Sequence, residues 1–298
     1  LSGFDFTGAA LSDSKLGGAD LRQATLVGTD LTDADLTDAD LTDAKLDGHD
    51  PVALIRQGAL AGSVHLTGVD LSYKDLSGID LSRTNLTDSN LTGTNLYEAN
   101  LQGHDLVALT RAGAHLEGVH AENSTLVAVS LTGAHLEAAH LEGSDMSGAS
   151  LTGAHLWGAH LNNANLAGVQ ARGAHLEKVD LAGANLTGAK MYRSNLTGSN
   201  LAGAVLRDAN LAEAVLHYAD LAGADLNSAD LVGANLTKAN LMGSTLTNAN
   251  LSGVDLRTTI LTDAVLLEVR FDSSTRWPAG ISVPTPTAPS STDTNTDP

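Results

Sequence analysis

The sequence predicts an all-β solenoid, a rod built from one short repeated unit, and three regularities lead to that prediction. Leu or another apolar residue returns at every fifth position from Leu1 to Phe271, and only Pro51, Arg56 and Arg111 interrupt the series. A small residue, most often Ala or Gly, stands two positions before most of these Leu residues, and Asp, Asn or His most often stands directly before them. Gly, Asp and Asn recur two positions after the Leu, where they favour turns. A fixed short period requires each unit to bury its apolar face against its neighbours.

A period of five fits neither an amphipathic helix, which repeats every 3.6 residues, nor an ordinary strand, which repeats every two. A typical block runs from Ala184 through Leu186 to Gly188. We interpret each block as a short extended piece followed by a turn, with the Leu and the small residue pointing inward.

The motif small–Asp/Asn–Leu–polar–Gly resembles that of the pentapeptide-repeat family over about residues 1–275. The resemblance implies a right-handed quadrilateral β-helix with four blocks per coil. Residues twenty apart would then stack on one face at about 4.8 Å, and about twelve coils would make a rod of about 60 Å. The narrow interior of such a rod explains the small residues and the aromatic content of only 3%.

The departures from the repeat divide the chain into successive parts. We expect three β-helical segments, two short helical interruptions between them, a C-terminal cap and a disordered tail rich in Pro, Thr, Ser and Asp. The β-helical segments are residues 1–47, 61–103 and 115–271, and the helical interruptions are residues 48–60 and 104–114. The cap is residues 272–280, and the tail is residues 281–298.

The two interruptions resemble each other and lie 55 residues apart, which suggests an internal duplication. Asp50 and Asp105 are placed to cap the start of a short helix, and Pro51 suits its first turn. Arg56 and Arg111 recur at the same place in both copies. The helices are either spacers between the β-helical segments or projections that touch a partner.

Seven histidines stand directly before the Leu position between residues 115 and 175, and twenty residues per coil sorts them into two neighbouring columns. The columns are His115, His135, His155 and His175, and His120, His140 and His160. Glu follows most of them two positions later. Stacked imidazoles are competent zinc or nickel ligands and titrate near neutral pH, so a metal-binding or pH-sensitive surface is one hypothesis. The alternative is that His only replaces Asp or Asn near the turn.

Acidic residues crowd the first coils, and the whole chain carries a net charge of −19. Spread over about 60 Å, this is one charge per roughly 3 Å, about half the linear density of duplex DNA. Members of the resembled family that confer antibiotic resistance are described as DNA mimics that bind type II topoisomerase, which makes that enzyme an implied partner here. The candidate partner-binding residues are Asp30, Asp35, Asp40, Asp50, Arg56, Asp105 and Arg111.

Composition also limits the function classes. The acidic balance argues against direct binding of nucleic acid or of anionic membranes. The chain has no Cys, so it has no disulfide framework, and it has no apolar stretch of about 18 residues. We expect a cytoplasmic protein without cofactor, and nothing in the sequence indicates a homodimer. A filled column offers no concave cleft, so we expect no enzyme.

The predicted function is therefore that of a non-enzymatic interaction protein, in its most specific form an acidic DNA mimic that binds DNA gyrase or another type II topoisomerase. One alternative is a structural or scaffolding rod with an unknown protein partner. Another is a metal- or pH-responsive surface formed by the His and Glu residues. At the C-terminal end, Trp277 is expected to fold over the last coil, since an open β-helix end invites edge pairing.

Overall fold

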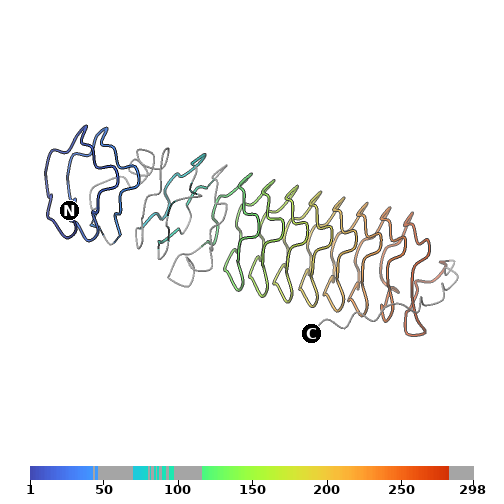
Figure 1. Cartoon of the computed structure of the whole chain (residues 1–298). Helices are drawn as coiled ribbons and strands as arrows, with labels where there is room; N and C mark the ends of the chain where they lie inside the picture. The colour runs from blue at the N-terminus through green and yellow to red at the C-terminus, as the bar shows by residue number, and fades with distance from the viewer. Residues whose placement is uncertain are drawn as a thin grey trace.

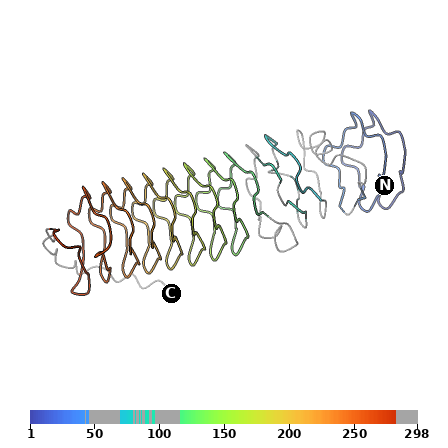
Figure 2. The same cartoon turned by 180° about the vertical axis from the view of Figure 1, so that it is seen from behind.

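The computed structural model shows a rod of stacked coils that runs from the N-terminus to the C-terminal end of the repeats (Figures 1 and 2). The predicted helical interruptions at 48–60 and 104–114 lie outside the described residues, as does the predicted tail beyond Ile281. The described residues contain no helix, so none of them forms an apolar helix long enough to cross a membrane. The structure describes residues 1–42, 44–45, 70–79, 81, 84, 86, 89–91, 94–96 and 116–281.

Isolated parallel bridges, rather than continuous strands, join successive coils. One residue in every five forms such a bridge, and its partner is the residue twenty positions later, as in the series Asp145, Asn165, Asn185. Four blocks therefore make one four-sided coil, as the resemblance to the pentapeptide-repeat family implies. Each side of the rod is a column of bridge residues that are twenty apart in the sequence.

Backbone hydrogen bonds between coils run along every side. The N–H of Leu166 donates to the carbonyl of Asn185 at 2.7 Å, and the N–H of Asn185 donates back to the carbonyl of Ala164 at 2.9 Å. At the corner, the N–H of Gly168 donates to the carbonyl of Thr187 at 2.9 Å. Each block is thereby bonded to the coils above and below it, which satisfies backbone groups that a lone block would leave unpaired.

The corners between sides are tight turns. The N–H of Ala184 donates to the carbonyl of Leu181 at 3.0 Å, and Gly183, the last residue before Ala184, has a φ of 67°. Glycine adopts this left-handed conformation at no steric cost. Side chains also occupy it elsewhere, as at Lys178 with a φ of 57° and Tyr218 with a φ of 58°. The coil thus imposes the conformation even where the residue does not favour it.

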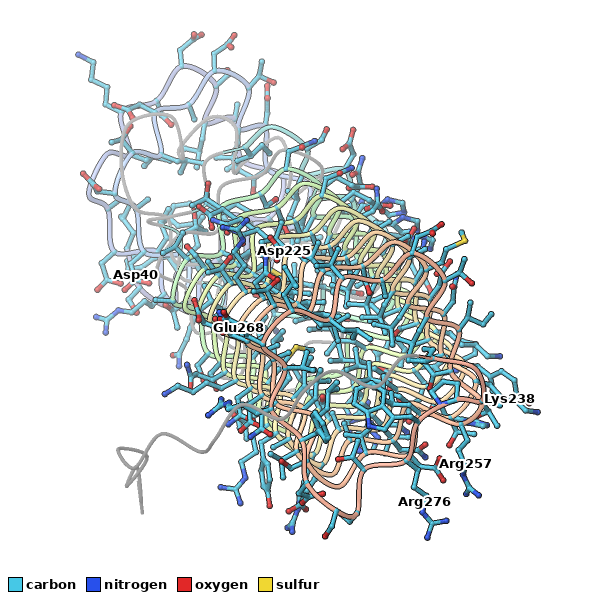
Figure 3. The ribbon with its side chains drawn as sticks, turned by 90° about the vertical axis from the view of Figure 1, so that its right-hand side faces the viewer. Asp40, Asp225, Lys238, Arg257, Glu268 and Arg276 are labelled. Carbon is cyan, nitrogen blue, oxygen red and sulfur yellow. The ribbon has the colours of Figure 1, made fainter. Side chains whose placement is uncertain are left out.

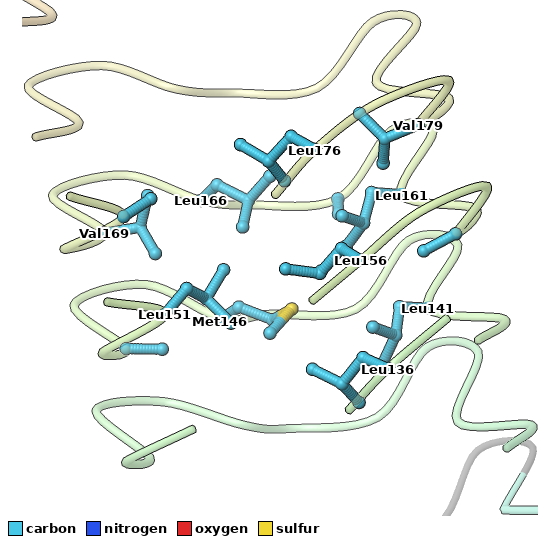
Figure 4. Close-up of a cluster of buried hydrophobic side chains, with 14 of the residues drawn as sticks. Leu136, Leu141, Met146, Leu151, Leu156, Leu161, Leu166, Val169, Leu176 and Val179 are labelled. Atoms are coloured by element: carbon cyan, nitrogen blue, oxygen red, sulfur yellow. The ribbon is translucent and has the colours of Figure 1, made fainter. Parts of the chain in front are cut away.

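The interior is a column of buried Leu side chains (Figure 4). The residue two positions before the Leu is also buried and is most often Ala, Val or Ser. Leu186 is 1% exposed and Ala184 is fully buried, and the same pattern recurs along the described coils. Several described Ser and Thr residues at the small position pair their hydroxyls with backbone carbonyls, whereas Ser14 Oγ is buried and has no hydrogen-bond partner among the described residues. Ser144 Oγ donates to the carbonyl of Leu141 at 2.7 Å, as buried polar groups require.

Among the described bridges, the twenty-residue register changes at two places. Asn95 is bridged to His120, twenty-five residues later, so the chain between these two rungs is one block longer than elsewhere. Asp255 is bridged to Arg276, twenty-one residues later, at the end of the rod. Between these two points every described bridge keeps the spacing of twenty.

The last described residues close onto the final coil. The N–H of Arg276 donates to the carbonyl of Val254 at 2.9 Å, and Thr275 Oγ1 donates to the carbonyl of Leu251 at 3.0 Å. The half-buried Trp277 packs against the core and meets the ring of Phe271 edge to face at 5.4 Å. Its ring therefore covers apolar surface that the last coil would otherwise expose.

Replacing Trp277 with Ala should lower the melting temperature and promote oligomers, because the end of the core loses its cover. We expect a loss of about 2 kcal/mol, roughly half of that for a fully buried Trp. Circular dichroism melting and size-exclusion chromatography would measure both effects. Trp157→Ala is the matched control, since Trp157 lies on the outer surface and is 52% exposed. An unchanged melting curve with monomeric elution of Trp277→Ala would refute the capping role.

Asp272 should make this end of the rod sensitive to acid. Its carboxylate accepts hydrogen bonds from the Oγ and N–H of Ser274, at 2.6 and 2.9 Å, and from the N–H groups of Thr275 and Gly253. These bonds, the Ser274 hydroxyl first, lower the pKa of Asp272 from 3.8 to about 2. Because the pKa is lower in the folded state, the stabilisation is complete above about pH 4 and is lost as the pH falls toward 2.

The wild type should therefore melt at a higher temperature than Asp272→Asn at pH 7, and the difference should shrink as the pH approaches 2. Melting curves of both proteins across this range test the prediction. A difference in melting temperature that stays the same at both pH values would contradict it.

Candidate functional site

The residues directly before Leu point outward and form ladders along the sides of the rod. Asn165 Nδ2 donates to Asp145 Oδ1 at 3.0 Å, and Asn200 Nδ2 donates to Asp180 Oδ1 at 2.9 Å, each across one coil. The same Asp180 oxygen accepts the N–H of Ala182 at 3.1 Å. The side-chain oxygen of an ordinary rung therefore accepts two hydrogen bonds, one from a backbone N–H of its own corner and one from a side-chain amide of the next coil.

Histidines replace these ladders in the middle of the rod. The rings of His120, His140 and His160 stack at centroid distances of 4.3 and 4.7 Å with their planes within 3° of parallel. We call these three the first His stripe. The second His stripe, on the adjoining side of the coil, consists of His135, His155 and His175, with centroid distances of 4.7 and 4.6 Å.

The structure thus brings six of the seven predicted histidines into two columns, and His115 lies outside the described residues. Five of these side chains are between one third and rather more than half exposed, from 34% for His140 to 57% for His135. Ligands in solution can therefore reach them.

The Glu side chains do not extend into solvent but fold back onto the imidazoles. His120 Nδ1 lies 2.9 Å from Glu122 Oε1, and His135 Nδ1 lies 3.0 Å from Glu137 Oε1. The second carboxylate oxygen of each of these Glu residues is buried and has no hydrogen-bond partner among the described residues. Burying a carboxylate oxygen without a hydrogen-bond donor costs free energy, and a positive charge close to each of these carboxylates would offset that cost.

Each Glu sits between two rungs of its column. Glu142 Oε1 is 3.2 Å from Nδ1 of His140 and 3.9 Å from Nδ1 of His160. Glu177 Oε1 is 3.6 Å from Nδ1 of His175 and accepts a hydrogen bond from the side-chain amide of Asn195. The carboxylate at the corner therefore lies close enough to contact side chains of two successive coils at once.

The acidic candidates of the first segment surround the rod and do not form one patch. Asp30, Asp35 and Asp40 are bridged to Ala10, Lys15 and Asp20 respectively, so they stand on three different sides of the same coil. Of the other candidates, Asp50, Arg56, Asp105 and Arg111 lie outside the described residues.

These carboxylates also hold the turns. Thr32 donates its hydroxyl and its N–H to Asp30, which lowers the pKa of Asp30, and Thr37 has the same effect on the pKa of Asp35. A bidentate pair with Arg22 lowers the pKa of Asp20 to about 2. These groups are therefore ionised at neutral pH, and the segment keeps its charge.

Sequence reasoning missed a set of exposed aromatic and cationic side chains at the corners. Arg172 and Arg193 lie over the ring of Tyr192 at 5.4 and 4.9 Å. Lys238 lies over the ring of Tyr218 at 4.8 Å. The spacing of twenty between Arg172 and Tyr192 was the available signal, but it falls on corner positions rather than on the Leu or Asp positions.

Side chains project from all sides of the rod, as a view turned toward its end shows (Figure 3). Asp40 and Asp225 lie far from Lys238, Arg257 and Arg276 in that view. Of these cations, Arg257 pairs with Asp255 at 2.6 Å and lowers the pKa of that carboxyl to about 2, whereas Lys238 donates to the hydroxyl of Tyr218 at 2.6 Å.

Several solved structures are similar to this chain. HetL, a pentapeptide repeat protein involved in heterocyst differentiation regulation from Nostoc sp. strain PCC 7120, is 26% identical with a TM-score of 0.49, over 75% of this chain and 96% of HetL. Full-length QnrB1, a plasmid-mediated fluoroquinolone resistance protein, is 18% identical with a TM-score of 0.24, over 71% and 94%. A pentapeptide repeat protein of the Arabidopsis thaliana thylakoid lumen is 27% identical with a TM-score of 0.20, over 41% and 71%.

No curated protein sequence matches the chain. The family model of pentapeptide repeats matches in eight copies, over residues 5–43, 65–106 and, in overlapping stretches, 112–263. Since these matches span well over half of the sequence and coincide with the four-sided coils, the chain belongs to the pentapeptide-repeat family and has its right-handed quadrilateral β-helix fold.

Proposed function

We propose that the protein is a non-enzymatic rod that binds a protein partner, and that its acidic first segment, residues 1–47, binds a basic surface of that partner. The observation that carries the proposal is the ring of ionised carboxylates on the first coils, which stand on three sides of one coil at Asp30, Asp35 and Asp40. A partner approaching from different directions therefore meets negative charge.

The charge density of this segment supports a specific class of partner. Ten acidic and three basic residues give residues 1–47 a net charge of −7. At twenty residues per coil and about 4.8 Å per coil, the segment is about 11 Å long, or one net charge per about 1.6 Å. Duplex DNA carries one per about 1.7 Å. A type II topoisomerase, whose DNA-binding surface is basic, is the partner that this density fits best.

The rest of the rod is much less charged. Residues 116–281 contain sixteen acidic and nine basic residues, so the same net charge of −7 is spread over a far longer stretch. That stretch is about 40 Å long, which gives one charge per about 6 Å. Mimicry of duplex DNA is therefore a property that we assign to the first segment and not to the whole rod.

The filled interior supports a binding role over a catalytic one. Leu and Ala side chains occupy the centre of the described coils, so a ligand meets convex outer faces there. Small-molecule sites are usually concave and apolar. The exposed aromatic and cationic corners, such as Tyr218 with Lys238, support the more general alternative of a scaffolding rod with another protein partner.

The triple variant Asp30→Asn, Asp35→Asn, Asp40→Asn should test the electrostatic role without breaking the turns. Asn accepts the same corner bond elsewhere, since Asn185 Oδ1 accepts the N–H of Thr187 at 3.2 Å. We expect the triple variant to bind DNA gyrase about tenfold more weakly than the wild type at low salt, with a smaller loss at high salt. Supercoiling assays with and without fluoroquinolone, together with direct binding measurements, provide the readout.

The matched control carries three Asp→Asn changes at Asp180, Asp220 and Asp230, which lie outside the first segment. Equal weakening by both triple variants would contradict the assignment to residues 1–47. If the wild type neither inhibits gyrase nor protects it at micromolar concentration, the topoisomerase proposal is wrong and the scaffolding alternative remains.

A further inference from the structure

We propose that the two His stripes bind divalent transition-metal ions, one ion in each stripe. The first site consists of His120, Glu122 and His140, and the second consists of His135, Glu137 and His155. Within each group, one ligand atom from every residue lies within 4.8 Å of the others. This proposal does not depend on the acidic first segment or on its partner.

The donor set has the chemistry of a zinc, nickel or copper site. Two imidazole nitrogens and one carboxylate oxygen are ligands that these ions bind well, and three protein ligands leave a further position for water. His120 Nδ1 and Glu122 Oε1 are 2.9 Å apart, and His135 Nδ1 and Glu137 Oε1 are 3.0 Å apart. Two ligands of one tetrahedral zinc ion, each about 2.1 Å from it, would be about 3.4 Å apart. Each His–Glu pair is therefore already close to chelating distance.

The third ligand needs a small movement. The stacked rings of His120 and His140 are within 3° of parallel, so their in-plane lone pairs do not yet converge on a common point. Both rings must turn toward the carboxylate that lies between them. Their side chains are 44% and 34% exposed, which leaves room for this rotation on the outer face.

The buried carboxylate oxygens are the second observation that points to a cation. Glu122 Oε2 and Glu137 Oε2 are both buried without a hydrogen-bond partner among the described residues. A divalent ion at Oε1 would neutralise the carboxylate charge that this burial makes costly. No described Asp of an ordinary rung has a buried carboxylate oxygen without a partner, and the Oδ1 atoms of Asp145 and Asp180 each accept both a corner N–H and an Asn amide.

The stripes limit the number of ions to one each. His140 belongs to the first site and also lies 3.2 Å from Glu142, beside His160. A neutral imidazole offers one in-plane lone pair, so His140 can ligate only one ion at a time. His155 is shared in the same way, because it stacks on His135 and on His175. Two ions per chain is therefore the expected number for the two stripes.

Isothermal titration calorimetry with zinc measures the number of ions that the full chain binds. We expect His140→Asn and His155→Asn each to lower the zinc stoichiometry by one and the double variant to lower it by two. Asn is the ordinary residue of these columns, as at Asn200 and Asn195, so the coil should persist. Circular dichroism melting verifies that. His175→Asn is the matched control, since it removes a stacked imidazole outside both groups and should leave the stoichiometry unchanged.

Cobalt gives an independent readout, because its visible absorption depends on ligand geometry. We expect the cobalt spectrum of the wild type to lose intensity stepwise in the two single variants, and to change with Glu122→Gln as well. The proposal is overturned if zinc binds the wild type and the double variant with the same stoichiometry, or if zinc produces no heat with the wild type.

Discussion

The parallel register of twenty residues is the constraint on which the other features of this rod depend. Each block forms hydrogen bonds with the blocks twenty residues before and after it, as between Leu166 and Asn185, so one coil positions the next at strand spacing. That spacing brings four Leu side chains per coil into one column and leaves room for only a small residue beside each. It also makes every outward position part of a ladder, whether the rung is Asn, Asp or His.

The same register decides which side chains can be adjacent on the outside. Two unit charges 4.8 Å apart repel by about 0.9 kcal/mol in bulk water. Among the described bridges, Asp and Asn alternate in the column Asp180, Asn200, Asp220, Asn240, and the amides of both Asn residues donate to the Asp residues below them. Asp20 and Asp40 are the one described Asp–Asp rung, and Arg22 lies against both carboxylates. The ladders therefore avoid or neutralise like charges on adjacent rungs.

The five-residue repeat made the buried Leu positions predictable. The four-sided coil and the two histidine columns were predictable from the resemblance to the pentapeptide-repeat family, which implies twenty residues per coil. The folding back of Glu122 and Glu137 was not predictable, since it depends on side-chain rotamers and on the space between two rungs. The twenty-one-residue bridge from Asp255 to Arg276 was not predictable either, because the five-residue series ends at Phe271 and no longer sets the register there. The clusters around Tyr192 and Tyr218 occupy corner positions that tolerate nearly any residue, so the repeat gave no reason to single them out.

The acidic residues of the first segment hold their turns, and that role can be separated from the partner binding that we propose for their charge. Asp30 accepts the hydrogen bonds of Thr32 that hold its corner, which alone would explain an Asp at this position. Asn performs that role equally well at Asn185 and Asn195, so the turn does not require a charge. The repeat nevertheless uses Asp on three sides of this coil and adds Asp33 and Asp38 at its corners. The turns do not require this charge, and its linear density is about that of duplex DNA, so it supports the partner-binding role that we propose for the segment.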